Sequence, residues 1–510
     1  MNKSRKRVRN TNNNYKKKNK QQRTRKIKHR SRTLGGRAVD AGGYGCIFNP
    51  QLESYNCIGN TSINNDKKNY ISKLMIKSDA EDEYNNSKKI NEIIKRGDRT
   101  IFRYVLTNDT SICQVRMMNK DDLDGYSSHC KKLKNMGFDF NEYNLSGITP
   151  ERLGKLRTIN SPNGGTNLYT IFNFLRESPS LELNRQFCVN YSMKIRDVYQ
   201  NAIYKLYNLS PKIIHGDMKE ENMICKFSKE PMAIAGTIKV IDWGLSYIYD
   251  PNSQRNSDIN LLAAINQLSR RPYQFNLPFT ILFYDSRFQQ EYKVRVLSVL
   301  NSLQSNSRVN QQQLIEEFCN SYFNNQYFYE NKKGERKYIL DDFNKSIFLV
   351  VKRVFPDIRM SLEDYVRKYL AAALNKYTYA NKRQSSFLFK ESVSKTETLG
   401  EVIFHSEVFS SEIYLPMIDS YGFFLTYGSL LSYFLFKSSN NVSRAYQSFD
   451  STMRRSDNVN YTKLLDICNF IATKLISQCL IFDPSITGEE YRKNTFNATR
   501  EIHNKILTLT

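Results

Sequence analysis

The chain has 510 residues, of which 40% are hydrophobic and 13% aromatic, so it is too long for one simple core and predicts two or three folded units. Its formal net charge is +26. The first ten residues, MNKSRKRVRN, contain no apolar stretch, so we expect no secretory signal peptide.

The positive charge is concentrated at the start of the chain. Residues 1–34 contain fifteen Lys or Arg and no acid, which leaves +11 for the remainder. Residues 1–37 offer almost nothing to bury, so we expect a basic disordered tail. Two interpretations of this tail stay open. It is either a solvated segment with a role in nuclear localisation, or an attachment to nucleic acid or another polyanion.

The nine cysteines lie far apart between Cys46 and Cys479 and form no CxxC pair. Small secreted proteins with a disulfide framework have an even number of cysteines, and zinc sites have closely spaced ones. We therefore expect reduced thiols in an intracellular protein, with neither a disulfide framework nor a zinc site.

The first folded region starts at Ala38 with the glycine-rich turn AGGYGCIFNP. YISKLM (70–75) is then expected to form a strand and the polar stretch 79–96 a helix. The stretch 120–154 reads as irregular. β-branched and aromatic residues predict further strands at IFRYVLT (101–107), SICQVRM (111–117) and KLRTI (155–159).

Helical patterns dominate from residue 167 onward. Residues 183–209 have apolar residues at three- and four-residue spacing and predict one long helix, and residues 286–380 also look helical. Two short strands, NMICKF (222–227) and TIKVID (237–242), are expected to pair as a hairpin. YGFFLTYGSLLSYFLF (421–436) is too short and too polar to cross a bilayer, so we expect a buried core helix there.

The stretch IIHGDMKEENMICKF, residues 213–227, places an acid, a cation and a carboxamide on one short loop. A hairpin would bring Asn222 and Asp242 to one mouth, where their oxygens suit Mg²⁺. Asp217 could then accept a proton from a hydroxyl group, and Lys219 could neutralise phosphoryl oxygens. These residue types predict phosphoryl transfer, which depends on positioning and charge neutralisation.

HGDMKEEN resembles the catalytic loop HRDxKxxN of protein kinases, and IDWG resembles their metal-binding DFG turn, in the family's chain order. The resemblance implies ATP and Mg²⁺ as cofactors, Asp217 as the catalytic base and Lys219 as the γ-phosphate contact. It implies Asn222 and Asp242 as the Mg²⁺ ligands.

Two more motifs of unequal strength precede this loop. ISKLM resembles the family's third-strand lysine motif, which implies Lys73 as the contact to the α- and β-phosphates, paired with Glu83 or its rivals Glu81 and Glu92. AGGYGCI resembles the glycine-rich loop only in part, because Asp40 stands at the first glycine position and would face phosphate unless it turns away. The resemblance implies these further nucleotide-binding residues: Asp40, Ala41, Gly42, Gly43, Tyr44, Gly45 and Ile47.

The resemblance implies an α+β, bilobal, protein-kinase-like fold with a small β-rich N-lobe and a larger helical C-lobe that carries a helical insertion. Residues 161–165 are either a plain turn or the hinge between the lobes. The expected divisions are the tail (1–37), the N-lobe (38–166), the first part of the C-lobe (167–284), the insertion (285–400) and the rest of the C-lobe (401–510).

The C-terminal half departs further from the family. Asp419 matches the aspartate of its buried central helix, and CLIFDP (479–484) resembles a late helix motif. No APE motif is present, and LPFT (277–280) and Glu407 are competing positions for that anchor. The insertion either binds a partner, shapes the substrate groove or is surface decoration.

Lys219 favours a Ser/Thr protein kinase over small-molecule kinases, which share HGD and IDW. Gly216 replaces the arginine that pairs with a phosphorylated activation loop, so we expect activity without that phosphorylation. A small-molecule kinase and a catalytically dead scaffold anchored by the basic tail are the alternatives.

The Asn- and Lys-rich texture, the GGYGCIFNP loop and RPYQFNLPF resemble the divergent kinase-like proteins of large DNA viruses. This resemblance implies a cytoplasmic location, including a host cytoplasm, with the nucleus and the virion as alternatives. The expected partner is a protein substrate, and no membrane partner is expected.

Overall fold

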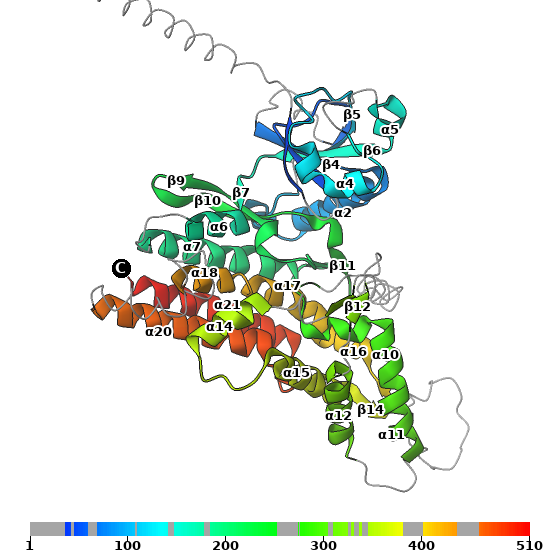
Figure 1. Ribbon diagram of the computed structural model, residues 1–510, viewed down its shortest axis with the longest axis vertical. Coiled ribbons are helices and arrows are strands. Elements are labelled where there is room, and N and C mark those ends of the chain that lie inside the picture. Colours follow the sequence, from blue (N-terminus) through cyan, green and yellow to red (C-terminus); the bar gives the residue numbers. More distant parts are fainter. Residues whose placement is uncertain are drawn as a thin grey trace, which may run out of the picture. The chain divides into compact units, whose positions relative to one another are not determined.

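The computed structural model describes most of the chain in separate stretches (Figure 1). The described residues are 36–41, 45–59, 69–107, 110–140, 147–177, 184–251, 274, 276–303, 310–324, 328–330, 336–338, 345–380, 401–435 and 458–509. The predicted tail therefore lies almost wholly outside them, as do Gly42, Gly43 and Tyr44.

The chain divides into two units. Unit 1 comprises Met1–Asn85 and Asp109–Asn163, and unit 2 comprises Asn86–Asn108 and Gly164–Thr510. Unit 1 is built on a sheet, and unit 2 is mainly helical with small antiparallel sheets, so the chain has an α+β fold. The five predicted divisions of the chain remain predictions.

The sheet of unit 1 has six antiparallel strands in the order β1-β2-β4-β6-β5-β3. They are β1 (Arg37–Ala41), β2 (Gly45–Asn49), β3 (Ser54–Gly59), β4 (Tyr70–Ile76), β5 (Ser111–Val115) and β6 (Leu156–Pro162). The strands predicted at 70–75, 111–117 and 155–159 are confirmed, whereas β1, β2 and β3 were not predicted.

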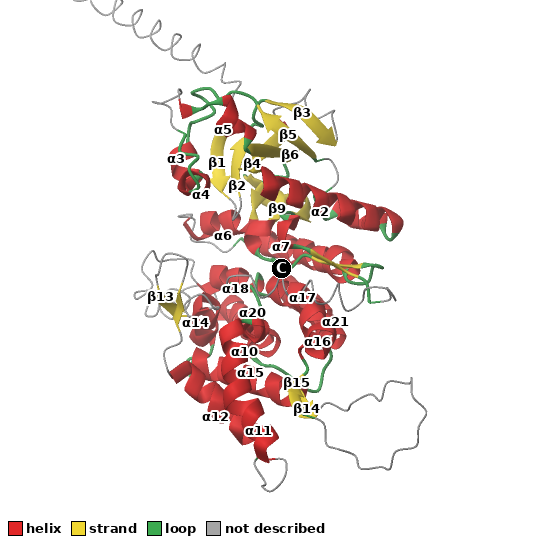
Figure 2. Ribbon diagram, turned by 90° about the vertical axis from the view of Figure 1, so that its right-hand side faces the viewer, coloured by secondary structure: helices red, strands yellow, loops and turns green. Residues whose placement is uncertain are grey.

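Both faces of this sheet carry apolar clusters. The predicted helix at 79–96 is confirmed as α2 (Lys77–Arg96), which passes from unit 1 into unit 2. At its start Ala80 packs with Met75 of β4 and Ile159 of β6. The other face packs against three short helices. α3 (Tyr126–His129) and α4 (Lys131–Asn135) lie beside β1 and β2 (Figure 2), and α5 (Pro150–Gly154) contacts β5 and β6. Residues 120–154 are therefore more regular than predicted.

The prediction of reduced thiols is wrong for four of the nine cysteines. Disulfide bonds join Cys46 to Cys130 and Cys57 to Cys113, across 84 and 56 residues of sequence. The strands bring these distant residues together, so their spacing along the chain carried no signal of pairing. The other five cysteines are buried and lie outside these two bonds: Cys188, Cys225, Cys319, Cys468 and Cys479.

The strand predicted at 101–107 is also wrong. Arg99–Arg103 form a 3₁₀ helix, because the Asp98 side chain accepts a hydrogen bond from the Thr100 amide and caps its start. Ile101 is buried in the core of unit 2, and Val105 forms an isolated parallel bridge with Val240. The β-branched residues of this stretch thus reflect burial rather than strand pairing.

The predicted hairpin of unit 2 is confirmed. β9 (Met223–Lys229) and β10 (Met232–Val240) pair antiparallel, and β7 (Thr166–Asn167) extends their sheet in the order β10-β9-β7. A second small sheet joins β8 (Lys212–Ile214) to β11 (Tyr247–Tyr249). These two sheets hold both ends of the loop that contains Asp217.

The remaining elements of unit 2 pack around one large apolar cluster. The helix predicted at 183–209 is confirmed as α7 (Arg185–Val198), which continues through a π-helical turn into α8 (Tyr204–Leu206). The further helices are α6 (Leu168–Glu177), α10 (Ser286–Tyr292), α11 (Ser298–Leu303), α12 (Gln311–Asn324), α14 (Lys345–Val354), α15 (Leu362–Tyr377), α16 (Ser406–Phe409), α17 (Leu415–Phe424), α18 (Tyr427–Leu435), α20 (Asn458–Leu475) and α21 (Gly488–Leu507).

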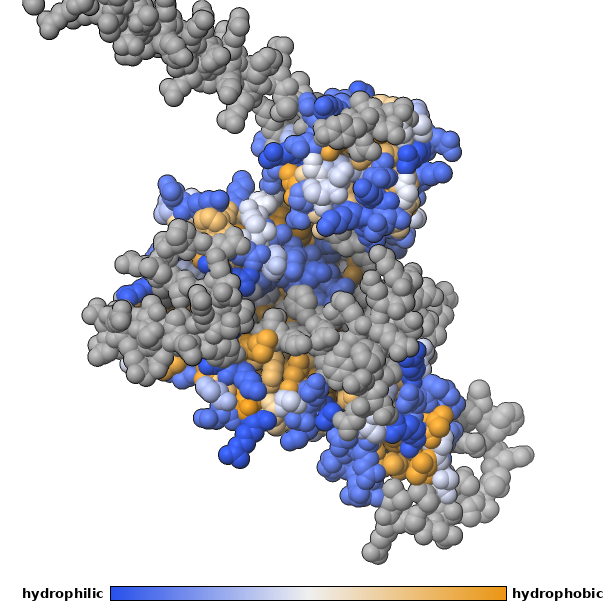
Figure 3. Space-filling view, in the orientation of Figure 1, coloured by the Kyte–Doolittle hydropathy of each residue, from blue (hydrophilic) through white to orange (hydrophobic). Residues whose placement is uncertain are grey.

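The apolar stretch predicted to be a buried helix is confirmed as two helices, α17 and α18, whose residues are almost all buried. Among the described residues no helix combines the length and the apolar character needed to span a membrane. The described surface that faces the viewer in Figure 3 is hydrophilic over most of its area.

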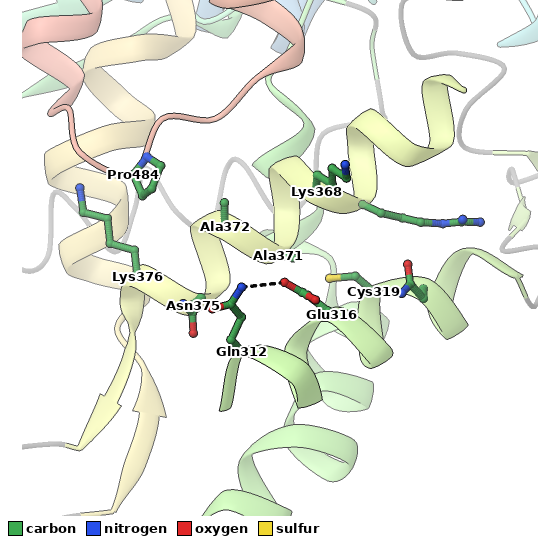
Figure 4. A pocket seen from close by; sticks show the side chains of 11 residues that line it. Gln312, Glu316, Cys319, Lys368, Ala371, Ala372, Asn375, Lys376 and Pro484 are labelled. Atoms are coloured by element: carbon green, nitrogen blue, oxygen red, sulfur yellow. Dashed lines mark hydrogen bonds between the residues drawn. The ribbon is translucent and has the colours of Figure 1, made fainter. Parts of the chain in front are cut away.

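The described part of residues 285–400 is mainly helical, as predicted. Short strands interrupt it, with β12 (Phe328–Glu330) paired to β13 (Arg336–Tyr338) and β14 (Thr378–Ala380) paired to β15 (Val402–Phe404). A cavity of about 540 Å³ lies between α12 and α15 (Figure 4). Polar side chains such as Gln312, Glu316 and Asn375 line it beside Ala371 and Ala372.

Candidate functional site

The β9–β10 hairpin brings Asn222 and Asp242 to the same end of the sheet. Val240 pairs with Met223 in the last register position, and the Ile241 amide donates to the Asn222 carbonyl oxygen at 2.9 Å. Asp242 follows with φ 65°, in the left-handed region that non-glycine residues rarely adopt. Such strained positions persist where surrounding structure enforces them, and they cluster at functional sites.

Asp217 lies at the centre of the loop 215–222, with only 5% of its surface exposed. Lys219 Nζ is 2.9 Å from Asp217 Oδ2. Asn222 Nδ2 donates to Asp217 Oδ2 at 3.1 Å and to the Asp217 carbonyl oxygen at 2.8 Å. The structure therefore brings together the three loop residues that the sequence singled out.

Asn276 is a fourth member of this cluster that the sequence reasoning missed. Its Nδ2 donates to Asp217 Oδ1 at 2.9 Å and to the Met218 carbonyl oxygen at 3.2 Å, and the residue is 1% exposed. The signal was present, because a single polar residue interrupts the apolar run FNLPF. Buried polar side chains are hydrogen-bonded as a rule, so an asparagine in such a run suggests a specific partner.

A buried carboxylate holds the backbone of the loop in place. Asp419 of α17 accepts hydrogen bonds from the amides of His215 at 2.6 Å and Gly216 at 2.7 Å. His215 Nε2 donates to the Ile241 carbonyl oxygen at 2.8 Å, and its ring packs edge-on against Trp243 at 4.7 Å. The loop is thus tied to α17 on one side and to the end of β10 on the other.

Two glycines permit close contacts around this loop. A Cβ on Gly422 of α17 would lie 2.4 Å from the Met218 carbonyl oxygen, so only glycine allows the helix this close to the loop. Gly216 has φ +74°, and a Cβ there would lie 2.6 Å from the ring of Tyr247. Position 216 therefore has neither the backbone conformation nor the space for a larger side chain.

In unit 1, Lys73 Nζ lies 2.7 Å from Glu83 Oε2 and 2.9 Å from Glu83 Oε1. Both side chains are about nine-tenths buried, at 12% and 10% exposure. Glu81 instead pairs with Lys77 at 3.9 Å, and Glu92 is exposed. Of the three predicted partners, Glu83 thus makes the ion pair with Lys73.

The structure describes the residues on either side of the glycine-rich turn, up to Ala41 and from Gly45 onward. Asp40 is exposed, and its carboxylate accepts a hydrogen bond from the Ala41 amide at 2.8 Å, so it turns back on its own backbone. Ile47 pairs with Lys73 across β2 and β4. A Cβ on Gly45 would lie 3.2 Å from Lys73 Cγ, so this glycine lets the lysine stem pass close to β2.

The structure also places the two competing anchor positions, LPFT and Glu407, and the predicted turn or hinge 161–165. Leu277 and Phe279 of LPFT are fully buried next to Asn276, whereas Glu407 lies on α16. The LPFT segment therefore lies next to the loop 215–222, because Asn276, directly before it, donates to Asp217 and to the Met218 carbonyl oxygen. The chain passes from unit 1 to unit 2 for the second time between Asn163 and Gly164, within the predicted turn or hinge 161–165.

Glu220 of the same loop is buried and does not behave as an ordinary surface carboxylate. Burial raises its pKa to about 8, while a hydrogen bond from Ser429 of α18 opposes the shift. Ser429 Oγ donates to Glu220 Oε2 at 2.8 Å, and no hydrogen-bond donor reaches Oε1 from the described residues. At pH 7 this side chain is a neutral carboxylic acid.

The donor set at the end of the hairpin suits Mg²⁺. The side-chain nitrogen of Asn222 points to Asp217, so the carboxamide oxygen of Asn222 points away from Asp217. Asp242 supplies a carboxylate. Mg²⁺ retains several waters and takes one or two protein carboxylates, so this small set fits. A full protein cage is not formed, since the described residues contain no cluster of three or more His, Cys, Asp or Glu with metal-binding geometry.

Comparisons with known proteins leave the family open. No protein-family model matches the chain, and no curated protein sequence is significantly similar to it.

Proposed function

We propose that this protein is a Ser/Thr protein kinase with a bilobal protein-kinase-like fold. The observation that carries the proposal is the Asp217 cluster, in which Lys219, Asn222 and Asn276 all direct nitrogen atoms to one carboxylate. The anchoring of this loop by Asp419 and the Lys73–Glu83 ion pair support it. The contacts of Asn276 and Asp419 join residues that lie far apart in the sequence, and this is what supports the proposal.

In the proposed reaction, Asp217 orients the hydroxyl group of a Ser or Thr side chain and accepts its proton. The hydroxyl oxygen forms a bond to the γ-phosphorus of ATP, and the bond from that phosphorus to the bridging oxygen breaks. ADP carries away the electron pair of that bond. Lys219 offsets negative charge on the transferred group, and Asn222 and Asn276 keep the carboxylate of Asp217 in one orientation.

The roles in nucleotide binding follow the same proposal. Lys73, held by Glu83, contacts the α- and β-phosphates, and Asn222 and Asp242 hold Mg²⁺. When bound, Mg²⁺ supplies charge neutralisation at the phosphates. A small-molecule kinase is disfavoured by Lys219, whose ammonium group lies 2.9 Å from the proposed base.

The proposal includes activity without phosphorylation of the activation loop. Gly216 supports this part, because its φ of +74° and the close Tyr247 ring leave no room for the arginine that would bind a phosphorylated loop. Tyr247 belongs to β11, which pairs with β8 directly before the loop, so the obstruction is part of the loop's own support.

The test is transfer of labelled γ-phosphate from ATP with Mg²⁺ to the protein itself, to a panel of proteins and to a panel of small hydroxyl compounds. Asp217→Asn keeps the size and the hydrogen-bonding shape but removes the base, so we expect phosphate transfer to fall by at least about a hundredfold while ATP binding persists. Lys155→Ala, an exposed change outside the proposed site, is the control. Phosphatase treatment before the assay should leave the rate unchanged.

Each result has a distinct meaning. Label on Ser or Thr that disappears in Asp217→Asn supports a live protein kinase. Label that persists in the variant indicates a contaminating kinase, and transfer only to small molecules would favour the small-molecule alternative. ATP binding without any transfer would favour the scaffold, and loss of activity after phosphatase treatment would contradict the role given to Gly216.

A further inference from the structure

The strand β3 is weakly attached to the rest of unit 1. It lies at the edge of the described sheet, where it pairs with β5, and none of its six residues is buried. β3 therefore adds no described side chain to the two apolar clusters of this sheet. Segments that bury little apolar surface open most readily in a folded protein. Attachment of β3 thus depends on its hydrogen bonds and on its covalent link to β5.

The covalent link lies where the pairing of the two strands is disrupted. The register shifts between Tyr55 and Ile58, so that Asn56 and Cys57 stand opposite the single residue Cys113 of β5. Such a bulge interrupts the ladder of backbone hydrogen bonds. Asn56 has φ 49°, in the left-handed region that non-glycine residues rarely adopt. The disulfide bond from Cys57 to Cys113 therefore joins the strands at the weakest point of their pairing.

The two disulfide bonds of unit 1 differ in their access to solvent. Cys46 and Cys130 are 0% and 2% exposed, so a thiol in solution has no route to the bond between them. Cys57 is half-buried, and Ile58 beside it is 67% exposed. Thiol–disulfide exchange requires a thiolate to reach one of the two sulfur atoms. The bond between Cys57 and Cys113 is therefore the more accessible of the two.

A buried hydrogen-bond network connects this bond to β4. Asn160 Nδ2 donates to Cys113 Sγ at 3.3 Å and to Ser54 Oγ of β3 at 3.1 Å. Asn160 Oδ1 accepts a hydrogen bond from Ser72 Oγ at 2.6 Å. Asn160 and Ser72 are fully buried and pair across β6 and β4, and Ser72 directly precedes Lys73. Release of β3 therefore removes a partner from a buried carboxamide that supports the strand of Lys73.

We propose that the disulfide bond between Cys57 and Cys113 is a redox switch. A low-molecular-weight thiol such as glutathione reduces the bond, β3 is released from β5, and ATP then binds more weakly. The effect on ATP binding rests on the proposed function, because it acts through the strand that carries Lys73. Reduction and the release of β3 follow from the geometry of unit 1 alone.

The reduction proceeds by two exchange steps. The thiolate of one glutathione attacks Sγ of Cys57, the bond between the two protein sulfur atoms breaks, and Cys113 leaves as a thiolate. A second glutathione thiolate attacks the glutathione sulfur of this mixed disulfide, which releases Cys57 and forms glutathione disulfide. Two electrons pass from the two glutathione thiols to the protein. Their two protons end on Cys57 and Cys113, so both sides balance.

The test is equilibration of the full-length protein in glutathione buffers of graded ratio, with the state of each cysteine read by alkylation and peptide mass spectrometry. We expect the Cys57–Cys113 bond to be reduced in a buffer at least about tenfold less reducing than the Cys46–Cys130 bond requires. Hydrogen exchange of the same samples should show faster exchange of the β3 amides after this reduction. Calorimetric titration should show ATP affinity lower by about threefold to tenfold, as expected for the loss of one buried hydrogen bond.

A double variant separates the switch from other effects of the thiol. Cys57→Ser with Cys113→Ser represents the reduced state, so it should bind ATP like the reduced wild type at every glutathione ratio. Cys468→Ala, at a buried cysteine of unit 2, is the control and should respond to glutathione like the wild type.

The outcomes separate the inference from the proposed function. Reduction of the Cys46–Cys130 bond first, or unchanged exchange of the β3 amides after reduction, would overturn the inference alone. Equal ATP affinity of the oxidised and the reduced wild type would also overturn it. A wild type that binds no ATP in either state would instead overturn the proposed function, and with it the effect on ATP binding.

Discussion

Asp217 shows how a single residue depends on segments that are remote in sequence. Asn276, 59 residues later, donates to its carboxylate, and Asp419, 203 residues from Gly216, fixes the preceding backbone. Each donor restricts the rotation of a side chain that must meet a substrate hydroxyl group in one orientation. Loss of one donor should therefore affect the chemical step more than nucleotide binding.

Asn276→Ala tests this expectation. We expect kcat to fall by about tenfold to a hundredfold, with the affinity for ATP unchanged, because Asp217 Oδ1 loses its donor while the nucleotide contacts remain. Steady-state phosphate transfer and ATP titration measure the two quantities. Gln274→Ala, in the same segment, is the control and should retain the wild-type kcat. Equal losses of kcat and ATP affinity in Asn276→Ala would indicate a general disturbance of the loop instead.

Glu220 makes the stability of the protein depend on pH. Its pKa rises from 4.5 to about 8 on folding because the carboxyl group is buried. Between these values the folded state holds a proton that the unfolded state has lost, so this residue's contribution to stability falls as the pH rises. The free-energy cost of keeping the Glu220 carboxyl group buried is absent below pH 4.5 and reaches its full value above about pH 8.

Glu220→Gln removes the titration and keeps the shape and the acceptor for Ser429. We expect the variant to be more stable than the wild type at pH 8 by on the order of a few kcal/mol, with the difference disappearing near pH 4.5. Urea unfolding of both proteins across this range measures the difference. A stability difference that is constant with pH would show that Glu220 does not hold a proton in the folded state.

At the scale of the elements, α17 is the support on which the loop 215–222 rests. It is buried along its whole length, and it contributes Asp419 and Gly422 to one face. The missing side chain at Gly422 brings the helix against the Met218 carbonyl oxygen, and Asp419 then reaches two backbone amides. Close packing and hydrogen bonding at this contact therefore depend on one another.

Gly422→Ala tests that dependence. The new Cβ would lie 2.4 Å from a backbone oxygen, so the helix or the loop must shift, and we expect a loss of about 1–3 kcal/mol in the free energy of unfolding together with a lower kcat. Gly154→Ala is the matched control, because its Cβ would meet nothing within 4 Å. Denaturant unfolding and phosphate transfer measure both effects. Equal stability of the two variants would contradict the close approach of α17.

The elements also show where sequence patterns succeed. The short strand-like runs at 70–75, 222–227 and 237–242 were predicted, and they correspond to β4, β9 and the second half of β10, which pair with neighbouring strands. The stretch 101–107 has similar composition but forms a 3₁₀ turn, because Asp98 caps it and Ile101 packs into a helical core. β-branched residues indicate burial, and only the neighbouring elements decide whether a strand partner exists.

At the scale of the whole molecule, each unit holds one part of the proposed machinery. Unit 1 contains the Lys73–Glu83 ion pair and two disulfide bonds, and unit 2 contains the loop 215–222 with α17 behind it. The cysteine spacing did not reveal these bonds. Four cysteines in the sheet of unit 1 and its covering helices pair because the fold brings distant stretches of the chain together, whereas the five in unit 2 lie outside these bonds.

The sequence by itself determined the order of the motifs, the residue types at Lys73, Asp217, Lys219, Asn222 and Asp242, and the hairpin that joins the last two. These depend on neighbours along the chain, where a local pattern carries the information. Only the tertiary structure decided that Glu83 is the partner of Lys73, that Asn276 joins Asp217, and that Cys46 meets Cys130. Such contacts arise from the packing of segments tens of residues apart, and a local pattern does not encode which distant segment will lie opposite.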